Sequence, residues 1–172
     1  MKTVLLGYMG SGKSTVAKLL SNHLNIPFTD LDDYIEEKEQ KSIKELFNDK
    51  GEIYFRLQES KYLKEVLQDT NPGIIALGGE TPCYADNMAL IKNLSKSFYL
   101  KGSIATISDR LQSEKSQRPL IAALNQEQLT EFIAKHLFER REYYAQATNT
   151  VIIDGKTAEE IKDELIQELG SV

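Results

Sequence analysis

The sequence has very little of the residue types that form disulfides and hold structural metals. Its 172 residues include one cysteine, Cys83, and two histidines, His23 and His136. A single cysteine excludes an internal disulfide and a thiolate metal cluster, and the two histidines lie too far apart in sequence to suggest a zinc pair. We therefore expect Cys83 to be an incidental small residue and both histidines to lie on helix surfaces.

Long apolar segments and an excess of basic residues are missing as well. No run approaches the roughly 20 apolar residues of a membrane span, and the segment before Gly7 is too short for a signal peptide. The net charge of −5 gives no reason to expect nucleic-acid binding. We expect a cytoplasmic protein with no nucleic-acid or membrane partner. The length predicts one domain over residues 1–172, and the absence of a coiled-coil pattern favours a monomer.

Short β-rich segments alternate with longer segments of helical periodicity. This alternation predicts an α/β fold, a three-layer sandwich in which helices cover both faces of a five-stranded, mostly parallel sheet. The runs IIAL and VII suit strands that are buried on both sides. The predicted strands are KTVLLG, PFTD, GIIALGG, SFYLKG and NTVIIDG. The predicted helices cover residues 14–24, 31–67 with a break near Gly51, 86–94, 104–111, 127–144 and 158–169.

The stretch GYMGSGKST, residues 7–15, joins the first predicted strand to the first predicted helix. It matches the G-x-x-x-x-G-K-[ST] pattern, in which backbone N–H groups and the start of a helix surround phosphate oxygens. Gly10 and Gly12 allow the backbone torsions that such a loop requires. Lys13 is expected to reach the β- and γ-phosphates of a nucleotide, and Ser14 to bind the Mg²⁺ that bridges them.

Three carboxylates, Asp30, Asp32 and Asp33, follow the second predicted strand in the stretch TDLDD. Ligands of open α/β sheets bind beyond the carboxyl ends of the strands, where the phosphate loop also lies. One of these carboxylates can hold Mg²⁺ directly or through water, and another can orient a hydroxyl for attack on the γ-phosphate. Capping of the next helix is the alternative, although two acids at i and i+2 exceed what one cap requires.

Arginines and glycines supply the other candidate residues. Arg56 in YFRLQE and the glycines of IIALGGE each have a simpler alternative, a surface position and a tight turn respectively. Arg118 lies in residues 111–128, a polar segment without clear periodicity that we interpret as a lid. An arginine on such a loop can close over the transferred phosphate and exclude water. Arg140 and Arg141 end a long predicted helix, where the helix dipole explains one of them.

In this order and spacing, the motifs GYMGSGKST, FTDLDDYIEE, GEIYFRLQES, IIALGGE, SQRPL and ERREYY resemble shikimate kinase, a family of small P-loop kinases of the chorismate pathway. The resemblance spans nearly the whole chain. It implies a nucleoside-monophosphate-kinase-like fold with a substrate-binding region at about residues 31–61 and a mobile lid at about residues 111–125. The implied reaction transfers the γ-phosphoryl group of ATP, with Mg²⁺, directly to the 3-hydroxyl of shikimate.

The resemblance also implies roles for individual residues, by matching position. Asp32 would bind the ring hydroxyls of shikimate and orient or deprotonate the attacking one, and Asp30 would support Mg²⁺ through water. Arg118 would touch the phosphates and Arg110 would lie near the adenine. The implied catalytic residues are Lys13, Asp32 and Arg118; the ATP-binding residues are Gly10, Ser11, Gly12, Lys13, Ser14, Thr15, Arg110 and Arg118; the metal ligands are Ser14 and Asp30; and the shikimate-binding residues are Asp32, Arg56, Gly78, Gly79 and Arg140, with the two arginines on the carboxylate.

Two positions depart from the family's pattern. Glu80 stands where the family usually has a third glycine, and we expect it to point to solvent or to contact an arginine. Glu142 stands where a proline commonly lies two residues after the carboxylate-binding arginine. Arg140 is preferred to Arg141 as that arginine because Tyr144, the matching tyrosine, follows four residues later.

Two other functions are compatible with the motifs. A kinase of the same architecture could act on gluconate or a nucleoside monophosphate, because an arginine pair binds phosphate as well as carboxylate. A nucleotide-dependent switch is the second alternative. It is disfavoured because a guanine-specific N-K-x-D stretch is absent and the TDLDD carboxylates would have no purpose.

Overall fold

The computed structural model describes residues 1–170, and its centre is a strand whose five residues are all buried, β1 (Lys2–Leu6). Each neighbouring pair of strands is parallel, in the order β2-β3-β1-β4-β5. The prediction of a five-stranded parallel sheet is confirmed. The other strands are β2 (Phe28–Asp30), β3 (Gly73–Ala76), β4 (Ser95–Lys101) and β5 (Asn149–Ile152).

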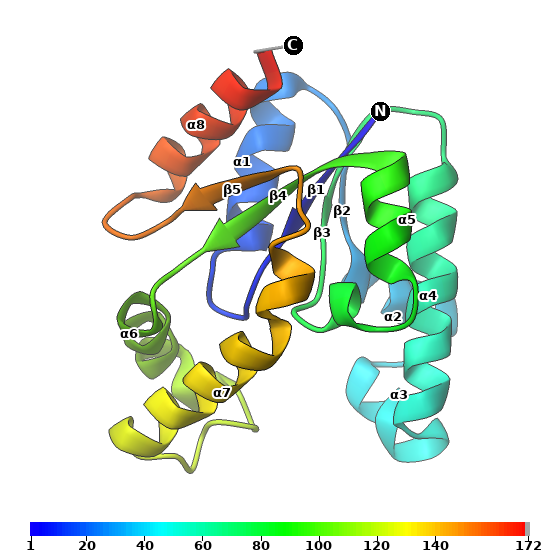
Figure 1. The fold of residues 1–172 in the computed structure, drawn as a ribbon. Helices are drawn as coiled ribbons and strands as arrows, with labels where there is room; N and C mark the ends of the chain where they lie inside the picture. Colours follow the sequence, from blue (N-terminus) through cyan, green and yellow to red (C-terminus); the bar gives the residue numbers. More distant parts are fainter. Residues whose placement is uncertain (171–172) are drawn as a thin grey trace.

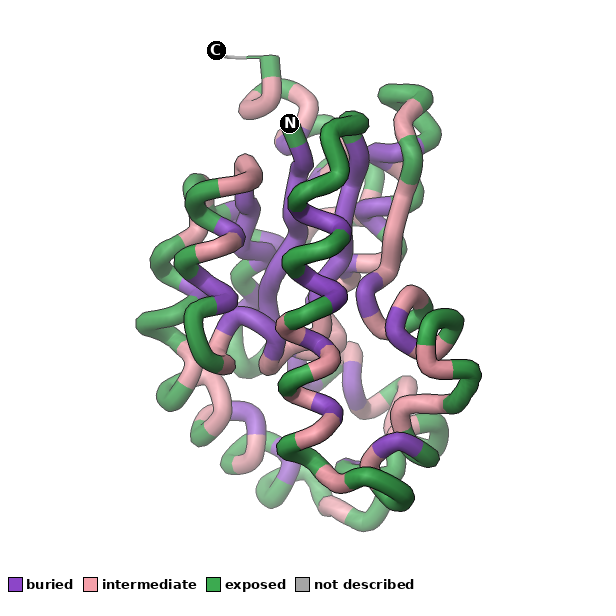
Figure 2. The backbone as a smooth tube through the Cα atoms, turned by 90° about the vertical axis from the view of Figure 1, so that its right-hand side faces the viewer, coloured by how far each residue is buried: buried purple, intermediate pink, exposed green. Residues whose placement is uncertain are grey.

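Helices cover both faces of this sheet, as predicted for a three-layer sandwich. Figure 1 shows α1 and α8 on one side of the sheet and α4 and α5 on the other. The buried residues are concentrated in the strands and on the helix sides that face them (Figure 2). The α-helices are α1 (Lys13–Leu24), α2 (Leu31–Glu39), α3 (Ile43–Lys50), α4 (Glu52–Gln68), α5 (Asn87–Leu94), α6 (Ile104–Glu114), α7 (Gln126–Tyr144) and α8 (Ala158–Gly170), and the short 3₁₀ helices are η1 (Thr81–Cys83) and η2 (Lys115–Gln117).

The predicted helix over residues 31–67 is interrupted twice rather than once. The break at Gly51 is present, but the chain also leaves the helix after Glu39. Gln40 there has a left-handed φ of 53°, and Ser42 begins α3 with a capping box. The Ser42 backbone N donates to Glu45 Oε2 at 2.7 Å, and the Glu45 backbone N donates to Ser42 Oγ at 3.2 Å. The predicted substrate-binding region therefore consists of α2, α3 and the start of α4.

Burial of the strands differs from the prediction at one edge of the sheet. Strand β3 and Leu77 are buried, as the run IIAL predicts. The run VII is not buried on both sides, because β5 is the last strand of the sheet. Val151 and Ile153 are buried, whereas Ile152 is 45% exposed.

Residues 111–128 are more regular than predicted. Helix α6 continues to Glu114, three residues past its predicted end, and η2 follows directly. Ile121 is fully buried and anchors the turns before α7 to the rest of the molecule. Among residues 1–170, no helix combines the length and apolar character of a membrane span.

Candidate active site

The phosphate-binding loop lies between β1 and α1, where it lines a cavity of about 550 Å³. Gly10 and Gly12 have φ values of 78° and 87°, in the left-handed region that favours glycine. Gly12 precedes α1, and within the described chain no side chain caps it. The first N–H groups of α1 are therefore left for an anion, which the helix dipole also favours.

Lys13 is buried within the loop. Its Nζ donates to the carbonyl oxygens of Gly7 and Tyr8, each at 2.8 Å. Burial lowers the pKa of Lys13 to about 8, against the opposing effect of the carboxylates of Asp32 and Asp30. A bound triphosphate would add negative charge and favour the protonated amine.

Asp30 links the phosphate loop to helix α2. The Ser14 hydroxyl donates to Asp30 Oδ2 at 2.6 Å, while Asp30 Oδ1 accepts from the Asp32 backbone N at 3.0 Å. Asp30 therefore caps α2 and also lies beside the loop, so the cap does not remove this carboxylate from the phosphate site. Hydroxyl and carboxylate oxygens suit Mg²⁺, which usually combines a few such ligands with phosphate oxygens and water. Within residues 1–170 there is no cluster of three acidic, histidine or cysteine side chains that could hold a metal by itself.

Asp32 lines two cavities at once. It borders the nucleotide cavity and a second cavity of about 390 Å³, which also share Met9, Gly78 and Gly79. Burial, reinforced by the nearby charges of Asp30 and Glu59, raises the pKa of Asp32 from 3.8 to about 6. A carboxylate of this pKa is ionised at neutral pH and is still basic enough to accept a proton.

The second cavity combines aromatic walls with charged groups. Such a lining fits a small ring that carries hydroxyls and an anionic group, because carboxylates accept hydroxyl hydrogens and arginines bind carboxylates in bidentate fashion. The lining residues that carry this argument are Asp32, Phe47, Phe55, Arg56, Glu80 and Arg140.

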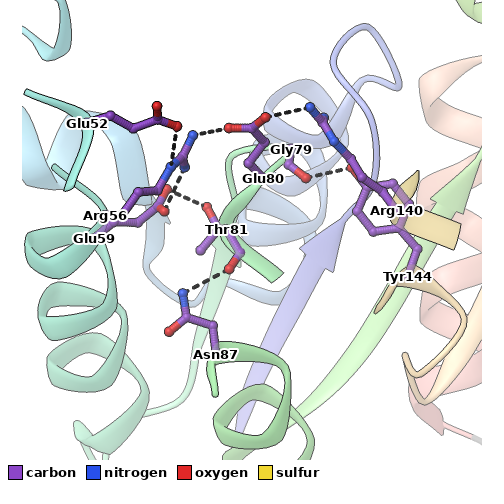
Figure 3. Close-up of polar contacts among 9 residues, drawn as sticks. All are labelled: Glu52, Arg56, Glu59, Gly79, Glu80, Thr81, Asn87, Arg140 and Tyr144. Atoms are coloured by element: carbon purple, nitrogen blue, oxygen red, sulfur yellow. Dashed lines mark hydrogen bonds and ion pairs between the residues drawn. The ribbon is translucent and has the colours of Figure 1, made fainter. Parts of the chain in front are cut away.

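Two arginines from distant parts of the chain approach each other across Glu80 (Figure 3). Arg56 comes from α4 and Arg140 from the last turns of α7, and their side chains are 13% and 11% exposed. Arg140 Nη2 donates to Glu80 Oε1 at 2.8 Å, and Arg56 Nη2 donates to Glu80 Oε2. Of the two expectations for Glu80, contact with an arginine is the one observed. Arg141 instead lies over the ring of Phe138, 4.4 Å from its centre.

Gly78 and Gly79 border the cavity at close quarters. The Tyr144 hydroxyl donates to the Gly79 carbonyl at 2.6 Å (Figure 3). A Cβ on Gly79 would lie 3.2 Å from Arg140 Nη1, and one on Gly78 would lie 3.3 Å from Asp32 Oδ1. These glycines leave room for the charged groups beside them, and the Thr81 backbone N–H donates to the Gly78 carbonyl at 3.2 Å in a tight turn.

Two further arginines, Arg110 and Arg118, line the nucleotide cavity. Arg110 Nη1 donates to the Ser11 carbonyl at 3.2 Å, which holds this side chain against the phosphate loop. Arg118 donates through Nε and Nη2 to Glu114 Oε2, at 2.9 and 2.6 Å. The structure therefore brings all of the predicted nucleotide-site residues to one cavity, with Ser11 and Thr15 in its lining.

Sequence reasoning missed three features of the site. Glu59 is buried and accepts from Arg56 Nη1 at 2.9 Å. Its spacing of three residues from Arg56 on a helix was a readable signal. Lys156 lines the nucleotide cavity, with no motif to mark it. His136 was expected only as a helix-surface residue; it is partly buried on α7, lines the second cavity, and its Nδ1 lies 2.8 Å from the Tyr8 hydroxyl.

Fold and site together define a P-loop kinase of a small, anionic acceptor. The model of the shikimate kinase family matches residues 9–170. The curated shikimate kinase of Flavobacterium johnsoniae is 50% identical over 96% of this chain and 96% of its own length. With these two matches, the chain belongs to the shikimate kinase family.

Solved structures agree with this assignment. The crystal structure of shikimate kinase from Bacteroides thetaiotaomicron has a TM-score of 0.90 and 35% identity, and the match covers 98% of each chain. Shikimate kinase from Acinetobacter baumannii, solved in complex with shikimate, has a TM-score of 0.85 and 28% identity over 98% of this chain and 92% of its own. The fold predicted from the resemblance is therefore confirmed.

Proposed function

We propose that this chain carries out the reaction of its family, in which ATP phosphorylates the 3-hydroxyl of shikimate to give shikimate 3-phosphate and ADP. The observation that carries the proposal is the cavity holding Arg56 and Arg140, which meets the nucleotide cavity at Asp32. One acidic ring compound that spans this cavity would place its carboxylate at the arginines and a hydroxyl at Asp32. The complex of the Acinetobacter baumannii relative with shikimate supports the choice of acceptor.

On the acceptor side, each charged group has a separate task. Arg56 and Arg140 bind the carboxylate and fix the orientation of the ring. Asp32 accepts a hydrogen bond from the attacking hydroxyl and takes its proton as the bond to phosphorus forms, for which a pKa of about 6 is suitable. Gly78 and Gly79 let the ring approach the backbone. Transfer is direct and in line, without a phosphorylated enzyme.

On the donor side, the residues from Gly10 to Thr15 bind the phosphates of ATP. Ser14 and Asp30 would hold Mg²⁺, which when bound neutralises charge on the phosphates. Lys13 and Arg118 stabilise the charge of the transferring group, and residues 111–125 form a lid that excludes water. Arg110 would lie beside the adenine of bound ATP. A single domain, a monomeric state and a cytoplasmic location remain predictions from the sequence.

The test is ATP consumption by the purified protein with Mg²⁺ and a series of acceptors. Stimulation by shikimate, and not by gluconate or nucleoside monophosphates, is the expected result. Stimulation by one of the other acceptors would keep the nucleotide site and reject the assigned acceptor. ATP hydrolysis that no acceptor stimulates would favour a nucleotide switch.

Substitution of two arginines tests the division between acceptor and donor sides. Arg56→Ala should chiefly raise the KM for shikimate, because the guanidinium binds the carboxylate in ground state and transition state alike. Arg118→Ala should chiefly lower kcat, because its charge acts on the transferring phosphoryl group. Arg141→Ala is the matched control, since this side chain packs on Phe138. Unchanged kcat in Arg118→Ala, or unchanged KM in Arg56→Ala, would contradict these roles.

A further inference from the structure

Glu80 already occupies the position between the two arginines that an acceptor carboxylate would take. Its two oxygens each contact one guanidinium, Oε1 that of Arg140 and Oε2 that of Arg56 (Figure 3). The geometry is that of a carboxylate shared by two arginines, which is also how the acceptor's carboxylate would be bound. An internal group thus competes for the same pair of cations.

Glu59 and Glu80 both neutralise Arg56, but they are held very differently. The Glu59 side chain is 2% exposed; it accepts from Arg56 at 2.9 Å and from the Thr81 hydroxyl at 2.8 Å. Thr81 is fixed in turn, because its carbonyl accepts from Asn87 Nδ2 at 2.9 Å. The Glu80 side chain is 45% exposed and sits at the border of the cavity. Glu59 is therefore a permanent partner of Arg56, whereas Glu80 is free to be replaced.

The structure also provides space for Glu80 to leave. A third cavity, of about 360 Å³, shares Arg56, Glu80 and Arg140 with the acceptor cavity and extends to Cys83 and Tyr84. Because Glu80 lines both cavities, its side chain has open space to turn into, beside Glu52 and Glu139. An acceptor that brings its own carboxylate would then leave the charge around the two arginines unchanged.

We propose that Glu80 is an affinity- and specificity-determining residue, an internal carboxylate that fills the carboxylate subsite of the free enzyme and that the acceptor must displace. This inference rests on the proposed function. The binding free energy of shikimate then reflects the difference between two similar states, the arginines paired with Glu80 and the arginines paired with the shikimate carboxylate. It is weaker than a bare arginine pair would give, because the arginines exchange one carboxylate for another.

The experiment replaces Glu80 by glutamine, which keeps the length of the side chain and removes its charge. For Glu80→Gln we expect the Kd for shikimate, from calorimetric titration, and the KM for shikimate to fall about five- to tenfold, with kcat and the KM for ATP unchanged. Glu52→Gln is the matched control. Glu52 Oε1 lies 4.0 Å from Arg56 Nε and lines the third cavity, and its side chain is 68% exposed. The control should bind shikimate as the wild type does.

The outcomes separate this inference from the proposed function. Wild-type protein that does not consume ATP in response to shikimate would reject the proposed function itself. A responsive wild type whose Glu80→Gln variant has an unchanged or raised Kd would overturn the inference alone, because Glu80 would then position the arginines rather than compete for them. Glu80→Gly, the residue usual in the family, is the second variant. The backbone φ of −94° at this position accepts glycine, and the same fall in Kd is expected.

Discussion

Asp32 is ionised at neutral pH in surroundings that disfavour its charge. We therefore expect its substitution to change the stability of the protein as well as its activity. Burial, with Asp30 and Glu59 nearby, raises its pKa from 3.8 to about 6. Because one pH unit corresponds to about 1.4 kcal/mol, the ionised group costs the folded state about 3 kcal/mol at most. Partial exposure to solvent reduces this to roughly 1–3 kcal/mol. Asp32→Asn removes the charge and keeps the shape, so it should stabilise the protein at pH 7.

The pH dependence of stability tests whether ionisation of Asp32 is the cause of this difference. Between about pH 4 and pH 6 the folded protein keeps a proton on Asp32 that the unfolded chain releases, so the stability of the wild type falls as the pH rises. Asp32→Asn lacks this titration. Its advantage should be near zero at about pH 4, grow through this range and be complete above about pH 6. At pH 7 the gain corresponds to a Tm increase of about 3–9 °C.

The assay is urea unfolding of both proteins at pH 4, 5, 6 and 7, together with steady-state kinetics at pH 7. The kcat of Asp32→Asn should fall by roughly 100-fold or more, as expected on loss of a general base. Glu37→Gln, an exposed change on the same helix, controls for the removal of one negative charge. An equal difference in stability at pH 4 and pH 7 would refute the reasoning from ionisation, and an unchanged kcat would refute the role as base.

Two further substitutions test the geometry around the site. Gly10→Ala places a Cβ 2.9 Å from Leu111 Cδ2, on a residue whose φ is 78°. The resulting backbone strain is on the order of 1–3 kcal/mol, and because it falls on the phosphate loop the variant should raise the KM for ATP about tenfold or more. Gly51→Ala has a φ of 85°, and within residues 1–170 its added Cβ would meet no atom within 4 Å beyond its chain neighbours, so it should lose stability and keep the KM for ATP. Equal KM values in the two variants would contradict this account. Tyr144→Phe removes the hydrogen bond to Gly79 and should lower the Tm by about 2–6 °C in a thermal melt, whereas an unchanged Tm would show that this bond contributes nothing.

The parts of the fold that the sequence predicts well are those whose signals are local. The phosphate loop carries its glycines, lysine and flanking strand and helix within residues 2–24, and the structure agrees there. The break before α3 is absent from the prediction although it too has local signals: Ser42 and Glu45 have capping-box spacing, and residues 36–42 contain no apolar side chain. Exposure of Ile152 depends on the order of the strands, which periodicity does not reveal.

The parts of the site that the sequence predicts poorly depend on contacts between distant segments. Arg140 and Glu80 are 60 residues apart, and they meet because the last turns of α7 pack beside η1. His136 pairs with Tyr8 across 128 residues, so its cavity position has no local sign. Motif matching selected Arg140 over Arg141, but only the three-dimensional arrangement relates Arg140 to Glu80 and Arg56.

The buried end of α7 has a consequence for the order of events in catalysis. Tyr144 is fully buried and its hydroxyl donates to the Gly79 carbonyl, which fixes the turn of α7 that carries Arg140 to the segment after β3. The other end of the same helix directly follows the predicted lid. If residues 111–125 close over ATP as proposed, we expect the end of α7 that carries Arg140 to stay in place. We therefore expect acid-bearing inhibitors to bind the arginine end without nucleotide, although Leu120 of the predicted lid also lines the acceptor cavity.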